Sequence, residues 1–144
     1  MDVSVLLATY KRTEILFRTL DSMTRVDAAD LNWEVLVIDN AEDPETMGIV
    51  RGFERILPVT LMIEKKPGKN NALNRAITKA KGDFLLFTDD DVLIDRNWLV
   101  EMWKGARRWR SYFVFGGKVE PEWPLKPPFW GENHPLTETL FALH

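Results

Sequence analysis

The sequence predicts an α/β protein with a Rossmann-like, open and mostly parallel sheet and helices on both faces of that sheet. Three short apolar runs with few polar interruptions are typical of parallel strands that are covered on both sides. Segments with apolar residues at helical spacing lie between these runs. Strands that alternate with helices are joined by right-handed crossovers, and an open sheet follows.

The expected strands are the apolar runs at 3–8, 33–38 and 83–88, a weaker strand at 59–63 and a last strand at 112–115. The apolar residues that define the first two helices are Leu16, Leu20, Met23, Leu73, Ala76, Ile77 and Ala80. Gly82 stands where the second helix should have its C-terminal cap. A third helix is expected to begin at Asp95, a favourable N-cap residue, and to continue to Trp109.

Composition narrows the class of protein. With 45% apolar and 28% charged residues, the 144-residue chain resembles a soluble globular protein, and its net charge of −3 gives no general attraction to nucleic acid. The absence of cysteine excludes disulfides and thiolate chemistry. No apolar run approaches the about 20 residues that cross a bilayer, and no signal peptide is recognisable. A cytoplasmic location is expected, with peripheral contact at the inner membrane face as a second option.

Residues 120–144 differ in amino-acid composition from residues 1–119. Prolines at 121, 124, 127, 128 and 135 alternate with large aromatic residues, and this density excludes regular helix or a central strand. We expect an α/β domain over 1–119 and an ordered loop or lid over 120–144, or a segment that awaits a partner. His134 and His144 in this region are expected to be surface residues rather than metal ligands.

Polar residues follow each expected strand at its carboxyl end, where ligands bind in open parallel sheets. These residues are Thr9, Tyr10, Asp39, Asn40, the segment 65–70, Asp89, Asp90 and Asp91. Three adjacent carboxylates repel one another unless a cation or solvent compensates their charge. Mg²⁺ or Mn²⁺ could do so through Asp89 and Asp91, although a solvated turn is the alternative.

Two further features suit a nucleotide. Asp39 could accept a hydrogen bond from a base or a ribose, or it could be an ordinary turn residue. The segment 66–71 lacks the spacing of a Walker A loop. Gly68 and the following helix start nevertheless offer backbone N–H groups and a positive dipole end, and Lys69 adds charge suited to a diphosphate. A simple glycine turn before a helix is the alternative.

Four segments in order resemble the inverting glycosyltransferases of family 2, which have the GT-A fold. They are the strand and turn at 3–12, the strand at 34–40 that ends in an Asp, the helix start Gly-Lys-Asn-Asn-Ala-Leu-Asn at 68–74, and the strand with its Asp-rich (DxD-like) loop at 82–91. The likeness covers residues 3 to about 119, and 116–119 with Trp123-Pro124 extend it.

The resemblance implies a role for each matched residue. Thr9 and Tyr10 would contact the nucleoside, Asp39 the base and Lys69 the diphosphate. In the acidic loop, Asp89 would lie near the ribose or the metal, Asp90 would contact the substrate, and Asp91 would bind the metal. Lys11 and Asn40 depart from the family's usual Asn and Asp, which leaves the identity of the nucleoside open.

The resemblance further implies a metal-dependent enzyme that uses Mn²⁺ or Mg²⁺. It would transfer a sugar from a nucleotide-diphospho-sugar, such as a UDP-sugar, to a hydroxyl of a glycan or lipid-linked acceptor. The family's catalytic base has no recognisable counterpart after Gly117, so the catalytic residue is unknown and transfer by this chain is expected to be poor or absent. A truncated or catalytically incompetent nucleotide-sugar-binding module is the alternative, and a nucleotidyltransferase is a poorer one. We expect either a longer polypeptide or a homodimer formed through the C-terminal tail.

Overall fold

The computed structural model describes residues 1–28 and 30–122. It divides the chain into two compact units, Met1–Trp109 and Arg110–His144. The domain boundary expected after residue 119 stays a prediction. The histidines, Trp123 and the other aromatic residues of the proline-rich tail lie outside the described residues.

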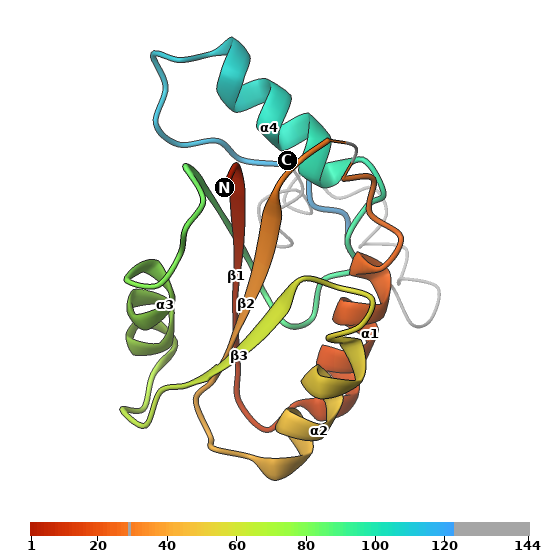
Figure 1. Cartoon of the computed structure of the whole chain (residues 1–144), viewed down its shortest axis with the longest axis vertical. Helices are drawn as coiled ribbons and strands as arrows, with labels where there is room; N and C mark the ends of the chain where they lie inside the picture. The colour runs from red at the N-terminus through yellow and green to blue at the C-terminus, as the bar shows by residue number, and fades with distance from the viewer. Residues whose placement is uncertain (29, 123–144) are drawn as a thin grey trace, which may run out of the picture. The chain divides into compact units, whose positions relative to one another are not determined.

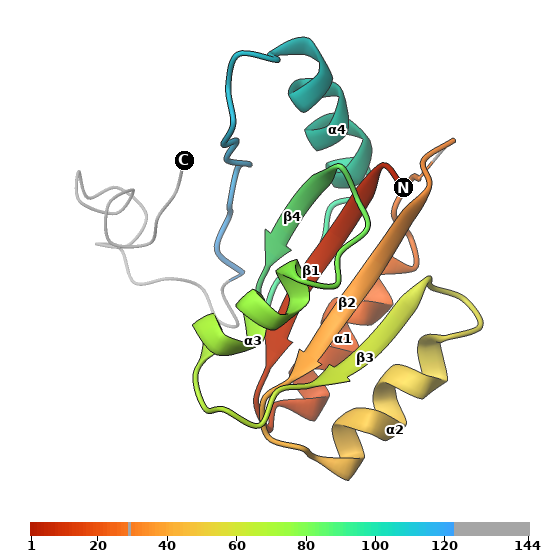
Figure 2. The same cartoon turned by 60° about the vertical axis from the view of Figure 1, so that its left-hand side comes forward.

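The first unit is built on a four-stranded parallel sheet with strand order β3-β2-β1-β4. Figure 1 shows β3, β2 and β1 side by side. The strands are β1 (Val3–Thr9), β2 (Trp33–Asp39), β3 (Val59–Ile63) and β4 (Phe84–Thr88). Figure 2 shows all four arrowheads pointing toward one edge of the sheet. In the observed register Thr9 lies opposite Asp39, and Asp39 lies opposite Ile63. The segments that follow the strands are thereby brought together, and the expected open α/β sheet is confirmed.

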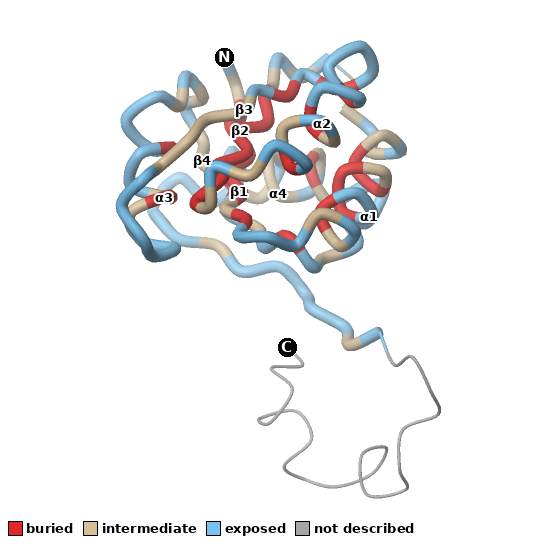
Figure 3. The backbone as a smooth tube through the Cα atoms, turned by 90° about the horizontal axis from the view of Figure 1, so that it is seen from below, coloured by how far each residue is buried: buried red, intermediate tan, exposed pale blue. Residues whose placement is uncertain are grey.

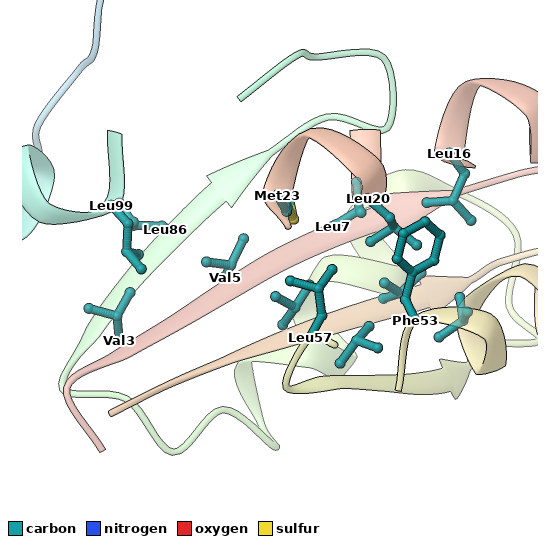
Figure 4. Packing of buried hydrophobic residues seen from close by; sticks show 14 residues of the cluster. Val3, Val5, Leu7, Leu16, Leu20, Met23, Phe53, Leu57, Leu86 and Leu99 are labelled. Carbon is teal, nitrogen blue, oxygen red and sulfur yellow. The ribbon is translucent and has the colours of Figure 1, made fainter. Parts of the chain in front are cut away.

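Helices cover both faces of the sheet. On one face, α1 (Thr13–Met23), α2 (Pro44–Phe53) and α4 (Trp98–Arg108) pack on alternate residues of the strands, such as Val5 and Leu7 (Figure 4). On the other face, α3 (Lys69–Ile77) packs through Ala72 and Ala76 on Leu6, Leu36 and Ile38. Figure 3 shows the strands between α3 on one side and α1 and α2 on the other. The expected α1 residues Leu16, Leu20 and Met23 are all buried.

Helix α2 is not among the helices expected from the sequence. Its start carries a recognisable signal, because Asp43 accepts a hydrogen bond from the Glu45 N–H at 3.1 Å and Pro44 occupies the first turn. Two glycines within the helix weaken the helical signal. Val50 and Phe53 nevertheless provide its buried face.

Helix α3 starts where it is expected to start but ends earlier, at Ile77, with Thr78 as its C-cap. The expectation that Gly82 caps this helix is wrong. Gly82 instead passes against β1, where a Cβ atom would lie 2.3 Å from the backbone nitrogen of Ser4. Its own N–H donates to the Ser4 hydroxyl at 2.8 Å. The glycine is required by this close approach of two backbone segments.

Replacing Gly82 with alanine is expected to lower the free energy of unfolding by about 1–3 kcal/mol, because backbone atoms must move to admit the methyl group. Denaturant titration measures the change. Gly48→Ala is the matched control, since no atom lies within 4 Å of the added Cβ in α2. That change should stabilise the helix by about 0.5–1 kcal/mol. Equal stability of Gly82→Ala and the parent would contradict the close approach.

Helix α4 begins at Trp98 rather than at Asp95, and Asn97 is its N-cap residue. The Asp95 side chain accepts from the Asn97 N–H at 2.8 Å, and its carbonyl accepts from the Trp98 N–H. The expectation that Asp95 is the N-cap is therefore wrong, because this residue accepts the hydrogen bonds of a turn at 96–97 that precedes the helix. Trp109 is the C-cap. None of the helices that the structure describes has the length and apolar content to cross a membrane.

The strand expected at 112–115 is absent from the described structure, in which residues 110–122 contain neither helix nor strand. Phe113 and Val114 are 93% and 86% exposed. A strand forms only when its backbone pairs with another strand, and a short apolar run does not specify that partner. The expectation of a strand at 112–115 is wrong for this reason.

Candidate functional site

A pocket of about 260 Å³ lies at the carboxyl ends of the strands in the first unit. Its walls come from the segments after β1, β2 and β4 and from the start of α3. The lining residues are Ala8, Thr9, Tyr10, Arg12, Asn40, Gly68, Lys69, Asp89 and Asp90. Ligands of open parallel sheets bind at this edge, so this pocket is the candidate functional site.

The central residue of the acidic loop points inward. Asp90 is 5% exposed, and its carboxylate accepts hydrogen bonds from the Thr9 hydroxyl at 2.7 Å and from Arg12 Nη1 at 2.9 Å. Its backbone carbonyl accepts from the Thr19 hydroxyl of α1 at 2.7 Å. These bonds fix the loop after β4 to β1 and α1. Asp90 therefore positions its two neighbours, Asp89 and Asp91.

Arg12 joins two carboxylates of the acidic loop. Its Nη1 lies 2.9 Å from Asp90 Oδ1, and its Nη2 lies 3.0 Å from Asp91 Oδ2. The hydrogen bond to Asp91 and the charge of Asp90 raise the pKa of Arg12 above its usual value. The guanidinium consequently stays charged, and it compensates the repulsion between these carboxylates.

Lys69 forms the corresponding pair on the other side of the pocket. It is the first residue of α3, and its ammonium group donates to Asp89 Oδ1. The preceding Gly68 adopts a φ of 116°, a conformation that L side chains rarely adopt. The start of α3 thus brings a cation and the positive end of a helix dipole to the pocket. Each carboxylate of the acidic loop has a cationic partner.

Asp39 is almost completely buried, with 1% exposure. Its two carboxylate oxygens accept hydrogen bonds from the Ala41 N–H at 2.8 Å and the Asp43 N–H at 2.6 Å. This side chain therefore shapes the turn after β2. Each oxygen retains a second lone pair that could accept from a ligand.

Five residues to which the family resemblance gives a role lie together in the lining of one pocket, and they are Thr9, Tyr10, Lys69, Asp89 and Asp90. Gly68, which the sequence places at the start of the helix, lines it as well. Asp39 and Asp91 are adjacent to lining residues but are not in the lining. Sequence reasoning gave no role to Arg12 or to the Asn40 side chain, which also line the pocket. The sequence does contain a signal for Arg12. It is a basic residue soon after the first strand, and an acidic loop follows another strand that ends at the same edge of the sheet.

The donor atoms fit a divalent cation only in part. Asp89 and Asp91 are exposed carboxylates, with side chains 51% and 48% accessible, and carboxylates are the protein ligands of Mg²⁺. Within 1–28 and 30–122, however, no three carboxylate or imidazole groups are arranged to hold a metal ion. A cation at these two carboxylates would need further oxygen ligands from water or from a diphosphate, and it would compete with Lys69 and Arg12.

A larger groove of about 1040 Å³ runs along β3. It is lined by all of β3 and by charged residues of α2 and α3, such as Arg51 and Arg75. Of the polar residues expected at the ends of the strands, Lys65 is the one that lines it. The smaller pocket is the better candidate because several loops converge there with opposed charges at the carboxyl ends of the strands.

Comparison with known proteins points to one family. The family model described as glycosyl transferase family 2 matches residues 4–142. Among curated relatives, the succinoglycan biosynthesis protein ExoM of Rhizobium meliloti (strain 1021) is 28% identical over 133 residues, which cover 85% of this chain and 42% of ExoM. The chain thus spans less than half the length of this relative.

Two solved structures share the fold. S. aureus TarS 1-349 in complex with UDP has a TM-score of 0.67 and 27% identity, and the match covers 76% of this chain and 33% of that chain. The mannosyltransferase PcManGT from Pyrobaculum calidifontis, in complex with GDP-Man and Mn²⁺, has a TM-score of 0.56 and 32% identity, with 63% and 28% covered. Each of the two matches covers more than half of this chain.

Proposed function

Because the chain belongs to glycosyl transferase family 2, we propose that its pocket binds the donor of a sugar transfer, a nucleotide-diphospho-sugar of the UDP class. The acceptor would be a hydroxyl of a glycan or of a lipid-linked sugar, and transfer would invert the anomeric carbon. The complexes of TarS with UDP and of PcManGT with GDP-Man support a nucleotide donor. A cytoplasmic location, with contact at the inner membrane face, belongs to the same proposal.

One observation carries the proposal: a cation and a helix start face an acidic loop across a single pocket. Lys69 at the start of α3 and Arg12 after β1 both lie in its lining, as do Asp89 and Asp90. Lys69 and the N–H groups of α3 suit the diphosphate, because both favour negative charge. Thr9, Tyr10 and Asp39 would contact the nucleoside.

Asp89 and Asp91 are the residues that would hold Mn²⁺ or Mg²⁺. The ion would supply positive charge to the leaving diphosphate. In the transfer, the acceptor oxygen forms a bond to the anomeric carbon. The bond from this carbon to the diphosphate oxygen breaks, with its electron pair going to the diphosphate. Lys69 and Arg12 would stabilise that developing negative charge.

The acceptor hydroxyl must lose its proton to a general base, and we assign none. Among the described residues, Asp89 and Asp90 are the carboxylates that line the pocket, and both are ion-paired. Glu120 and Glu122 belong to the second unit, and Glu132 and Glu138 lie outside the described residues. The alternative function, a nucleotide-sugar-binding module that does not catalyse transfer, is favoured by this lack of an assigned base.

Calorimetric titration with UDP, GDP and dTDP, each with and without Mn²⁺, tests the proposal. We expect UDP to bind, and to bind at least about tenfold more tightly with Mn²⁺, a difference of about 1.4 kcal/mol. A sugar-transfer assay on the same preparation separates the enzyme from the binding module. If none of the three nucleotides binds with or without the metal, the donor-site proposal is wrong.

A further inference from the structure

We infer that Asn40 is a positioning residue that holds the β3–α3 loop, and with it Lys69, in the form that receives the diphosphate. This inference rests on the donor site proposed above. The loop comprises residues 64–68, between the end of β3 and the start of α3. Asn40 itself takes no part in the proposed chemistry, because it acts through the position of the loop.

The side-chain amide of Asn40 forms hydrogen bonds to this loop through both its nitrogen and its oxygen. Its Nδ2 donates to the carbonyl of Glu64 at 2.6 Å and to that of Lys66 at 2.8 Å. Its Oδ1 accepts from the Gly68 N–H at 2.7 Å. The backbone N–H of Asn40 donates to the Thr9 carbonyl at 3.0 Å. The side chain thus connects the turn after β2 to three backbone groups of a single loop.

These bonds add to the hydrogen bond within the loop, in which the Lys66 N–H donates to Glu64 Oε1 at 2.8 Å. Gly68 has a φ of 116°, and its N–H is directed to Asn40 rather than to a helix partner. The peptide unit of Gly68 immediately precedes Lys69, whose ammonium group reaches Asp89 across the pocket. Asn40 is only 9% exposed, so water cannot easily replace its three bonds. Loss of this amide should release the loop and shift the cation.

Only an amide satisfies these partners. Two carbonyl oxygens require a donor, and one N–H group requires an acceptor. An aspartate of the same shape would place a carboxylate oxygen against the carbonyls of Glu64 and Lys66, which repel it. Asn40→Asp is therefore nearly isosteric yet should open the loop.

Tryptic cleavage gives a measure of the loop that does not depend on nucleotide binding. The Lys65–Lys66 peptide bond lies between the two carbonyls that Asn40 holds, and the Lys65 side chain is 75% accessible. Cleavage requires local opening of the backbone. We expect Asn40→Asp to accelerate release of fragment 1–65, followed by mass spectrometry, at least about fivefold. The Kd for UDP with Mn²⁺ should rise at least about tenfold.

Asn97→Asp is the matched control, because it makes the same chemical change at the N-cap of α4, where Asn97 makes no capping bond. The adjacent Arg96 carbonyl accepts from the Asp27 N–H beyond the end of α1, so this position lies at the opposite edge of the sheet. The control should match the parent in both cleavage and UDP affinity. Asn40→Ala, which adds no charge, is the second variant should Asn40→Asp not fold by circular dichroism.

The outcomes separate the two proposals. Unchanged cleavage at Lys65–Lys66 in a folded Asn40 variant would overturn the positioning role of Asn40. Faster cleavage with unchanged UDP affinity would also overturn it, since the loop would then be irrelevant to the donor. If the parent binds no nucleotide, the proposed function itself fails and the inference falls with it, whatever the cleavage rates. Faster cleavage together with weaker binding, in a variant with parental circular dichroism, supports it.

Discussion

Asp91→Ala is expected to abolish the metal-dependent part of nucleotide binding and to leave the fold intact. The Asp91 side chain is 48% accessible, and its ion pair with Arg12 is at the surface. Exposed pairs of this kind contribute about 0–1 kcal/mol to stability, so the fold should tolerate the change. A divalent cation that needs this carboxylate would instead lose one of only two protein ligands. Titration of UDP with and without Mn²⁺ measures the effect.

The control for Asp91→Ala is Asp21→Ala. Asp21 has the same side-chain accessibility of 48% and also pairs with an arginine, Arg25, at 2.7 Å. It lies on α1, outside the pocket lining. This variant should keep the full Mn²⁺ effect on UDP affinity. If Asp91→Ala binds UDP and Mn²⁺ as the parent does, the metal assignment is wrong.

The sequence allowed the sheet and the edge that carries the site to be predicted, because both depend on local patterns. Apolar runs such as 33–38 are recognisable without knowledge of their neighbours. The parallel arrangement then brings Thr9 and Asp39 level with each other at the ends of their strands. Polar residues after these strands had to converge at one edge. Their convergence followed from topology alone.

The internal contacts of the site could not be predicted in this way. Asp90 turns inward because Thr9 and Arg12 lie beside it, and these partners are separated from it by 81 and 78 positions along the chain. Asn40 likewise meets Gly68 across 28 positions. A sequence shows that three carboxylates are adjacent but not which of them faces a distant cation. The adjacent carboxylates alone therefore suggest compensation by a metal or by solvent, whereas in the structure Arg12 and Lys69 compensate their charge.

The errors in secondary structure have related causes. The run at 112–115 has the composition of a strand, yet pairing depends on a neighbour that the run does not encode. Glycine is a common residue type at a helix C-cap, yet Gly82 is required by its close approach to the β1 backbone at Ser4. Conversely, the sequence does contain a local signal for the start of α2, at Asp43 and Pro44, although α2 is not among the expected helices. Long-range backbone contacts account for the first two errors.

Asp39→Ala is expected to weaken nucleoside-diphosphate binding by about 1.5–3 kcal/mol even in saturating metal, through loss of charge-assisted hydrogen bonds. Two possible causes of this weaker binding can be distinguished by experiment. A carboxylate that reads the base would make the loss differ among UDP, GDP and dTDP. A carboxylate that only holds the turn, through the N–H groups of Ala41 and Asp43, would make the loss equal for all three nucleotides. Calorimetry with each nucleotide measures both quantities.

Asp2→Ala provides the matched control, because Asp2 Oδ2 also accepts a backbone N–H, that of Asn32, at 2.8 Å. Asp2 immediately precedes β1 and therefore lies at the opposite edge of the sheet from the pocket. Removing it should leave the affinity for every nucleotide unchanged. We expect the Asp39 loss to be largest for UDP, since we propose that Asp39 contacts the base as well as the turn. A loss confined to Mn²⁺ affinity would place Asp39 in the wrong part of the site, and an equal loss for all three nucleotides would reduce its role to that of the turn.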